Sequence, residues 1–272
     1  MKINNNNYYE LNNKGLSQSK IKAYDVCPNY MYRLYISGGL QRGSNKNFMV
    51  GSEVDSILTE MDKFQNTIIA PYKDFRTKEA REWKLDQEAL GKTVVKEDEY
   101  ENIMAIAISV QDTSIWKDIE KNFITQDILI KPDDTLGEHF NCLYGKPDAY
   151  RIDKNGVCTL LDLKTSMTID RKKFFYRAND LGYFKQLWMY SELLMYKYPE
   201  IKTFEYRFVV AEKSEPYHVK LFTVPSIYVT QSEAGMLETI DKIADDKEFK
   251  KPDVTWDDAE LLTLDNEEEN IC

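Results

Sequence analysis

The 272-residue sequence contains few cysteines, and none of the four forms a CxxC pair: Cys27, Cys142, Cys158 and Cys272. This scarcity argues against a thiolate zinc site and a disulfide framework, and it is typical of a reducing cytosol. Only two histidines are present, so an imidazole metal shell is not expected either. No apolar run approaches the roughly 20 residues that a membrane-crossing helix needs, and the first 15 residues lack the apolar segment of a secretory signal. We therefore expect a cytoplasmic protein without membrane contact.

The sequence also has fewer basic than acidic residues. The formal net charge is -10, because 46 acidic residues outnumber 36 basic ones. A protein that binds nucleic acid nonspecifically is usually basic. However, acidic residues gather in the last stretch, WDDAELLTLDNEEENIC, so the rest of the chain is closer to neutral. A local basic channel or a metal site can still dominate binding, so the net charge weakens a nucleic-acid role without excluding it.

The length suits one large domain between two tails. The Asn-rich segment 1–15 and the acidic segment 251–272 are expected to be flexible, and 16–250 to form the domain. Apolar spacing and capping residues predict helices at 16–36 (divided at Pro28), 48–64, 77–92, 97–112, 181–198 and 230–245. A hairpin precedes the fifth of these helices, and strands are predicted at 204–213 and 217–224. This order of elements indicates a single α/β domain.

The hairpin carries charged residues inside its apolar strands. In GKPDAYRIDKNGVCTLLDLKT, residues 145–165, these are Asp148, Asp162 and Lys164. If 154–156 form a three-residue loop, Gly156 takes the left-handed position and Asp148 lies directly opposite Asp162. A two-residue loop would instead set Asp148 opposite Leu163, on the other face. We expect the three-residue loop, because it brings the three charges together on one face.

Two carboxylates at such a short distance repel each other unless one is protonated or a cation lies between them. A hard divalent cation, bound by carboxylate oxygens, a backbone carbonyl and waters, would resolve the conflict. Lys164 beside it could position an attacking water or stabilise a developing negative charge. The alternative interpretation is an exposed edge hairpin with a simple Asp–Lys pair, since an isolated DxK pattern is common by chance.

The wider pattern resembles a known nuclease signature. Pro147-Asp148, followed after thirteen residues by Asp162-Leu163-Lys164, resembles the PD-(D/E)XK motif. Downstream, Tyr183, Gln186 and Tyr190 share one helical face and resemble the YxxQxxxY helix of the RecB-like and λ-exonuclease-like branch. An apolar core stripe would explain Tyr190, but a glutamine among Leu, Trp and Met needs hydrogen-bond partners for its amide.

Further stretches extend the resemblance over residues 16–224. LSQSKIKAYDVCPNYMY resembles the opening helix of this branch, and GSEVDS matches its Gly-x-x-x-His helix, with Asp55 where many members carry a metal-binding His. FRTKEAREW, GKTVVKEDEYENI and AEKSEPYHV resemble the RecE exonuclease domain in particular. Some relatives hold an iron–sulfur cluster through one early and three late cysteines. Cys27 matches the early ligand, but only Cys272 is late, so no cluster is expected.

The resemblance implies an α/β fold with a central mixed β-sheet flanked by helices, built around a restriction-endonuclease-like core. It implies that Asp148, Asp162 and the carbonyl of Leu163 bind Mg²⁺ (or Mn²⁺), with Asp55 as a further ligand. Lys164 would orient the nucleophile, and Gln186 would hold Lys164 or the scissile phosphate. The expected DNA-binding residues are Ser17, Ser19, Lys20, Tyr183 and Tyr190.

The implied activity is 5′ to 3′ degradation of one strand of double-stranded DNA from its ends, in phage or prophage homologous recombination. The implied partners are a single-strand annealing protein and further copies of the chain in a ring of three or four, within a bacterial host cell. The alternatives are an endonuclease or end-processing nuclease of the same fold, such as a CRISPR-adaptation type, and a catalytically inactive DNA-binding or protein-interaction module. The complete set Asp148, Asp162 and Lys164 argues against the inactive module, and the missing late cysteines argue against the CRISPR-adaptation type.

Overall fold

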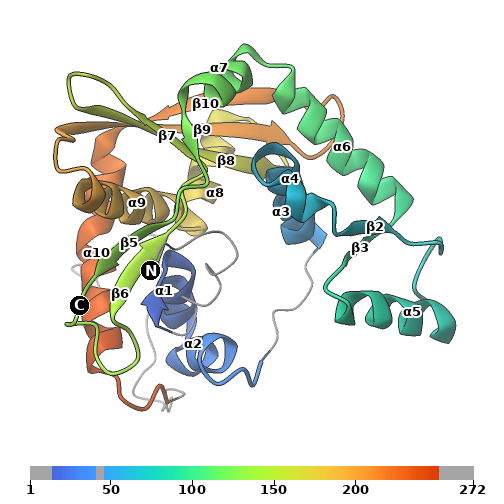
Figure 1. The fold of residues 1–272 in the computed structure, drawn as a ribbon, viewed down its shortest axis with the longest axis horizontal. Helices are drawn as coiled ribbons and strands as arrows, with labels where there is room; N and C mark the ends of the chain where they lie inside the picture. The colour runs from blue at the N-terminus through green and yellow to red at the C-terminus, as the bar shows by residue number, and fades with distance from the viewer. Residues whose placement is uncertain (1–13, 41–45, 251–272) are drawn as a thin grey trace, which may run out of the picture.

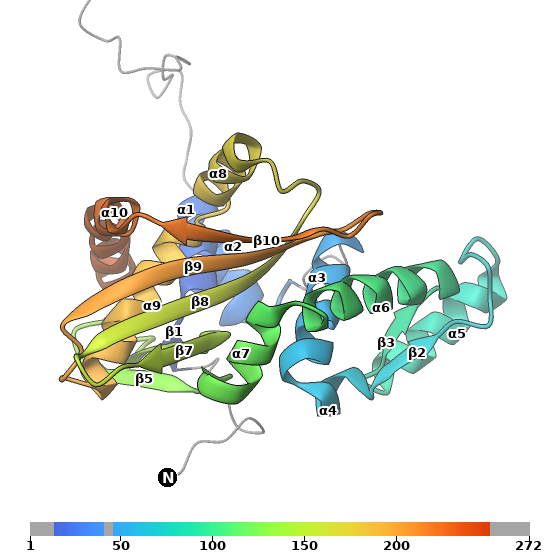
Figure 2. The same cartoon turned by 90° about the horizontal axis from the view of Figure 1, so that it is seen from above.

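A mixed five-stranded sheet runs through the middle of the molecule (Figures 1 and 2). The computed structural model describes residues 14–40 and 46–250. In spatial order the strands are β10 (Val219–Val224), β9 (Thr203–Glu212), β8 (Val157–Ser166), β7 (Ala149–Ile152) and β4 (Ile124–Thr125). Strands β8 and β9 pair in parallel, and the other neighbours pair antiparallel. The α/β fold with a central mixed sheet is thus confirmed.

Helices cover both faces of this sheet. On one face lie α1 (Gln18–Val26), α2 (Pro28–Tyr35), α8 (Arg171–Asp180), α9 (Tyr183–Lys197) and α10 (Ser226–Asp245). On the other lie α3 (Lys46–Thr59), α6 (Glu97–Gln111) and α7 (Ser114–Asn122). Because side chains alternate along a strand, β8 sends Leu160 into the first core and Leu161 into the second.

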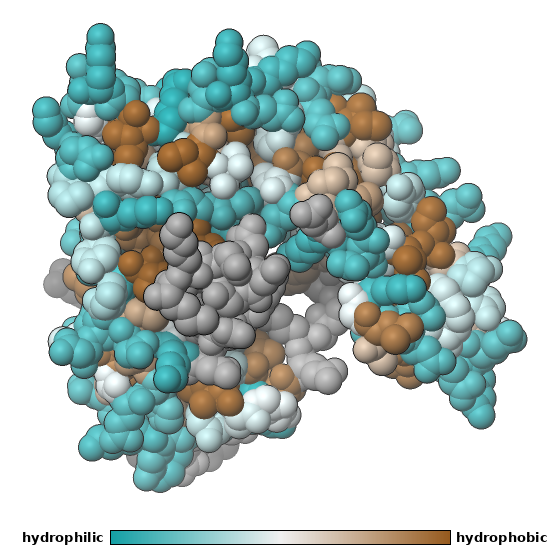
Figure 3. Space-filling model, in the orientation of Figure 1, coloured by the Kyte–Doolittle hydropathy of each residue, from teal (hydrophilic) through white to brown (hydrophobic). Residues whose placement is uncertain are grey.

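Two small sheets complete the fold. The first has the order β1 (Gly15–Leu16), β6 (Cys142–Gly145) and β5 (Leu129–Pro132), and it packs against α9. The second pairs β2 (Thr67–Ile69) with β3 (Thr93–Val95) in parallel. Together with α4 (Met61–Phe64), α5 (Lys78–Ala89) and part of α6, this second sheet extends away from the central sheet (Figure 2). Hydrophilic residues cover most of the face shown in Figure 3, and hydrophobic residues form separate groups between them.

Local chemistry explains the helix boundaries. Pro28 lies at the start of α2, where its missing N–H costs no helical hydrogen bond, so it divides the first predicted helix. The hydroxyl of Thr77 accepts the backbone N–H of Ala80 at 3.2 Å and begins α5. The segment 48–64 was expected to be one helix, but the structure interrupts it at Glu60, whose backbone leaves the helical region. The Glu60 carboxylate pairs there with Lys146 at 2.7 Å.

Short elements were missed by the sequence patterns: α7, α8 and the two small sheets lie outside the predicted segments. The proposed tails, 1–15 and 251–272, lie almost entirely outside the described residues, although Gly15 belongs to β1. Within the part of the chain that the structure describes, no helix is both long and apolar enough to span a membrane.

Candidate active site

The β7–β8 hairpin has the predicted three-residue loop. Gly156 adopts a φ of +83°, which glycine reaches without steric strain, and its N–H donates to the carbonyl of Asp153 at 3.1 Å. Ala149 pairs with Leu161, so continuing the register by one residue sets Asp148 opposite Asp162. The alternative two-residue loop is therefore wrong, and both carboxylates belong to the same face of the sheet.

The two carboxylates are held in a buried and strained electrostatic arrangement. Asp162 is only 1% exposed, and its Oδ1 has no hydrogen-bond partner among the described residues. The backbone N–H of Leu163 donates to Oδ2 of Asp148 at 2.7 Å. Burial raises the pKa of Asp148 well above its usual value, and the neighbouring charges of Asp162 and Asp55 raise it further. The site therefore disfavours two full negative charges unless positive charge lies close to them.

Lys164 supplies a positive charge next to the pair. Its ammonium forms an ion pair with Asp162 and donates to Oε1 of Gln186 at 3.1 Å. It also lies 4.7 Å from the centre of the Tyr183 ring. Burial alone lowers the pKa of Lys164, but Asp162 and Asp148 outweigh burial, so the net shift is upward. Lys164 is thus a cation at neutral pH.

Helix α9 holds Lys164 in place through Gln186. The amide of Gln186 donates from Nε2 to the hydroxyl of Tyr190 at 2.9 Å, so both ends of the amide are used. Gly145, just before the PD motif, allows β6 to approach this helix: a Cβ there would lie 2.9 Å from Cε1 of Tyr190. Sequence reasoning did not assign Gly145 a role, although it opens the quoted hairpin segment.

Asp55 lies beside this group on α3. Burial and the charge of Glu60 raise its pKa, whereas Lys146 and Lys164 act in the opposite direction. With Leu163 and Lys164 it borders a small cavity of about 30 Å³, which is room for a water-sized occupant. Sequence reasoning missed the Glu60–Lys146 ion pair, in which both side chains are 14% exposed. The only feature of the sequence that pointed to this ion pair was the position of Lys146 directly before the PD motif.

The donor set fits a hard cation that keeps part of its water shell. Within residues 14–40 and 46–250, no three Asp, Glu, His or Cys side chains form a ready ligand shell. Asp148, Asp162 and the Leu163 carbonyl offer oxygen ligands only, and Oδ1 of Asp162 is unpartnered. Mg²⁺ commonly takes one or two carboxylates and retains several waters, whereas structural zinc requires a closed nitrogen or sulfur shell. Asp55 lies near this set without closing it.

Two expected DNA contacts are corrected by burial. Lys20 has no exposed surface: its ammonium donates to the Gly15 carbonyl at 2.6 Å and lies 5.0 Å from the ring centre of Phe140. Tyr190 is 8% exposed and accepts from Gln186, so it supports the site from behind. Both are therefore unable to reach DNA in this conformation. Ser19 is exposed, and Ser17 and Tyr183 are half-buried; their DNA contacts stay predictions.

A solved structure shares this fold. A crystal structure described as a "putative exonuclease" from Eubacterium rectale is 14% identical, covers 90% of this chain and 87% of its own, and has a TM-score of 0.61. A second structure, SSO0001, is also 14% identical, over 72% of this chain and 86% of its own. Its TM-score of 0.30 is too low to support an argument. No curated protein matches the chain.

The sequence and the fold lead to the same superfamily. The PD-(D/E)XK signature was expected from residues 147–164, and the structure assembles its charged residues Asp148, Asp162 and Lys164 on one face of a mixed sheet. A PDDEXK-like domain of unknown function (DUF3799) matches residues 17–255, which is most of the chain. The protein therefore belongs to this family of PDDEXK-like domains.

Proposed function

We propose that this protein is a metal-dependent deoxyribonuclease that hydrolyses phosphodiester bonds. One observation carries the proposal: Asp148, Asp162 and Lys164 meet on one sheet face, and Gln186 from α9 fixes the lysine. A structural role alone explains this poorly, because two buried carboxylates without a cation between them destabilise the fold.

Asp148, Asp162 and the carbonyl of Leu163 would hold Mg²⁺, with Mn²⁺ as a substitute, and Asp55 would bind it directly or through water. When bound, such an ion stabilises negative charge on phosphate oxygens and lowers the pKa of water.

The protein's own groups then have separate tasks. Lys164 is cationic and keeps one of its three N–H donors beyond those used by Asp162 and Gln186, so it would orient the attacking oxygen and stabilise charge that develops beside Asp162. Gln186 would keep that ammonium aimed into the site, because its other end is tied to Tyr190. Tyr183 would limit the swing of Lys164 by covering it with its ring.

We further propose that the enzyme is an exonuclease that degrades duplex DNA 5′ to 3′ from its ends. The motif order that resembles the RecE and λ-exonuclease branch supports this finer assignment. The same resemblance supports phage or prophage recombination, an annealing partner, a trimeric or tetrameric ring, and the cytoplasm of a bacterial host. A ring would also suit an acidic protein, since enclosure can replace long-range attraction to DNA.

Digestion of matched DNA substrates tests the proposal. Linear duplexes labelled at either the 5′ or the 3′ end, and closed circles of the same sequence, would be incubated with Mg²⁺, with Mn²⁺ or with chelator. The Lys164→Ala protein, purified in parallel, controls for contaminating nucleases. We expect metal-dependent release of label from linear DNA and intact circles. Nicking of circles would favour an endonuclease, and inactivity of the wild type on every substrate would refute the nuclease assignment.

A further inference from the structure

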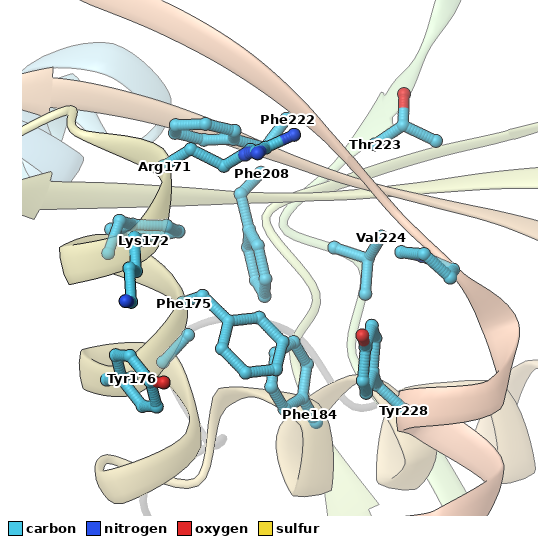
Figure 4. A pocket seen from close by; sticks show the side chains of 13 residues that line it. Arg171, Lys172, Phe175, Tyr176, Phe184, Phe208, Phe222, Thr223, Val224 and Tyr228 are labelled. Carbon is cyan, nitrogen blue, oxygen red and sulfur yellow. The ribbon is translucent and has the colours of Figure 1, made fainter.

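A second cavity lies between α8, α9, β9, β10 and the beginning of α10. It encloses about 450 Å³, which is within the usual range for small-molecule sites. Aromatic rings form most of its wall, and Figure 4 shows Phe175, Phe184 and Tyr228 grouped on one side with Phe208 facing them. The roles assigned above to the active-site residues leave this cavity without a function.

The rings around the cavity are fixed by contacts with one another. Phe174 stacks on Phe222 at a centroid distance of 5.2 Å, and Phe175 meets Tyr228 edge-on at 4.9 Å. Tyr176 stands at the opening with 56% of its surface exposed. A preformed space between ordered ring faces suits a flat aromatic ligand, because stacking there requires little side-chain ordering.

Positive charge surrounds the opening. Arg171 and Lys172 line it (Figure 4), are exposed, and form no ion pair with any residue in the described ranges. The ammonium of Lys220 lies 5.2 Å from the centre of the Phe222 ring. The nearby acid is Asp170, whose carboxylate accepts the backbone N–H of Lys173 at the start of α8. Two cations at the opening, and a third beside the Phe222 ring, contrast with the net charge of -10 and suit an anionic ligand.

Sheet register connects this cavity to the carboxylates. Asp162 pairs with Phe208 across β8 and β9, and Phe208 pairs with Phe222 across β9 and β10. Asp148, Asp162, Phe208 and Phe222 thus form one row across a single face of the sheet. Neighbouring strands are about 4.8 Å apart, and successive stacked nucleotides about 3.4 Å apart. The cavity is therefore within a few nucleotides of the place where a phosphate would meet Asp162.

We propose that this aromatic cavity binds an unpaired nucleotide at the end of the DNA strand, with the base between the rings and the phosphates near Arg171 and Lys172. The inference rests on the proposed nuclease function and deepens it, because it assigns the substrate class to frayed or single-stranded ends. Base stacking on aromatic rings tolerates any sequence, which suits an enzyme that must accept whatever base is terminal.

Fluorescence titration in chelator tests binding apart from cleavage. The probe is a single-stranded deoxyribonucleotide ten residues long, with 2-aminopurine at its 5′ or its 3′ terminal position or in its middle. We expect the terminal 2-aminopurine signal to change on binding more than the central one. Unlabelled dAMP serves as competitor, and we expect it to compete at least tenfold more weakly than unlabelled oligonucleotide, because it lacks the neighbouring phosphates.

Two kinds of variant test whether the 2-aminopurine fluorescence change comes from a base bound in the cavity. Tyr176→Leu and Phe175→Leu remove ring faces but keep apolar volume, and each should weaken binding about tenfold. Tyr196→Leu is the matched control, since Tyr196 is 52% exposed and lies outside the cavity. The double variant Arg171→Ala/Lys172→Ala should weaken binding and reduce its salt dependence. Its control, Lys117→Ala/Lys121→Ala, removes the same charge from α7 on the other face.

The outcomes separate the two proposals. If cavity variants bind the probe as the controls do, or if dAMP competes as well as the oligonucleotide, the strand-end site is refuted. If binding behaves as expected but the wild type cleaves no DNA with Mg²⁺ or Mn²⁺, the cavity assignment stands and the nuclease proposal fails. Circular dichroism melting confirms that every variant is folded.

Discussion

The Asp148 carboxylate accepts a hydrogen bond from the backbone N–H of Leu163 at 2.7 Å. Leu163 lies on the opposite strand of the hairpin, one residue beyond Asp162. The hydrogen bond fixes one carboxylate directly against the other, although burial and mutual repulsion both disfavour two charges there. The fold therefore tolerates an arrangement that only a proton or a cation relieves, and this property leads to measurable consequences.

Removing the ammonium should separate chemistry from binding. We expect Lys164→Ala to lower kcat by about 10²–10⁴-fold, as is typical when a positioned catalytic group is lost. Metal and DNA binding should persist, because Asp148 and Asp162 remain. Single-turnover cleavage and calorimetric Mg²⁺ titration measure the two effects. Lys164→Met, which keeps the aliphatic volume, guards against a folding defect, and Lys117→Ala on exposed α7 is the matched control. Undiminished cleavage by both Lys164 variants would contradict the assigned role.

Asp148→Asn should stabilise the metal-free protein while abolishing cleavage. The amide oxygen can still accept the Leu163 N–H, but the repulsion from Asp162 and Asp55 disappears. A gain of about 1 kcal/mol would raise Tm by roughly 2–4 °C for a domain of this size. The wild type should instead be stabilised by Mg²⁺, by about 2.7 kcal/mol at one hundred times Kd.

Scanning calorimetry with and without Mg²⁺ measures both effects. Asp134, on an exposed turn and without an ion pair in the described ranges, provides the matched control substitution, Asp134→Asn. If the Tm of the wild type did not change on addition of Mg²⁺ or Mn²⁺, this result would argue against a metal site at Asp148 and Asp162.

Gln186 should act through Lys164 and not independently. We expect Gln186→Ala to reduce kcat by about tenfold, less than Lys164→Ala, because the lysine loses only its orientation. Tyr190→Phe should have a smaller effect in the same direction, since the Gln186 amide loses an acceptor. In the double variant Lys164→Ala/Gln186→Ala, the loss should equal that of Lys164→Ala alone. Additive losses in this cycle would mean that Gln186 contacts the substrate directly.

Lys20 should make stability depend on pH in the alkaline range. Burial lowers its pKa from 10.5 to about 8, and the charge of Cys142 opposes this shift. Below pH 8 the folded and unfolded states both carry the proton, so the full cost of burying the charge is present. Between about pH 8 and 10.5 the unfolded state binds more protons, so the free energy of unfolding rises with pH.

The gain should approach about 3 kcal/mol, at 1.36 kcal/mol per pKa unit. Lys20→Met, which cannot titrate, isolates it: wild-type stability should rise relative to the variant between pH 8 and 10.5. Urea unfolding across this range measures the difference. Parallel curves for the two proteins would show that Lys20 does not lose its proton in the fold, whereas exposed Lys117→Met should behave like the wild type.

Local sequence determined much of the scaffold. The sequence 154–156 allowed a three-residue loop with Gly156 in the left-handed position, and this loop was preferred to a two-residue one because it sets Asp148 opposite Asp162; the structure has that register. Pro28 divided α1 from α2 for an equally local reason. The interruption at Glu60 was not predictable, since it coincides with an ion pair to Lys146, which is distant in the chain.

The sequence by itself determined which side chains share a strand or helix face, and thereby the group of Asp148, Asp162 and Lys164, whereas Gln186 was expected beside Lys164 only from the family resemblance. Only the tertiary structure decided which charges face solvent and which are buried. Lys20 was expected to bind DNA, yet its ammonium is buried against the Gly15 carbonyl and the Phe140 ring. The aromatic cavity likewise joins α8, β10 and α10, whose rings meet only when the chain folds. Periodicity reports the face of one element, whereas burial depends on what packs against that face.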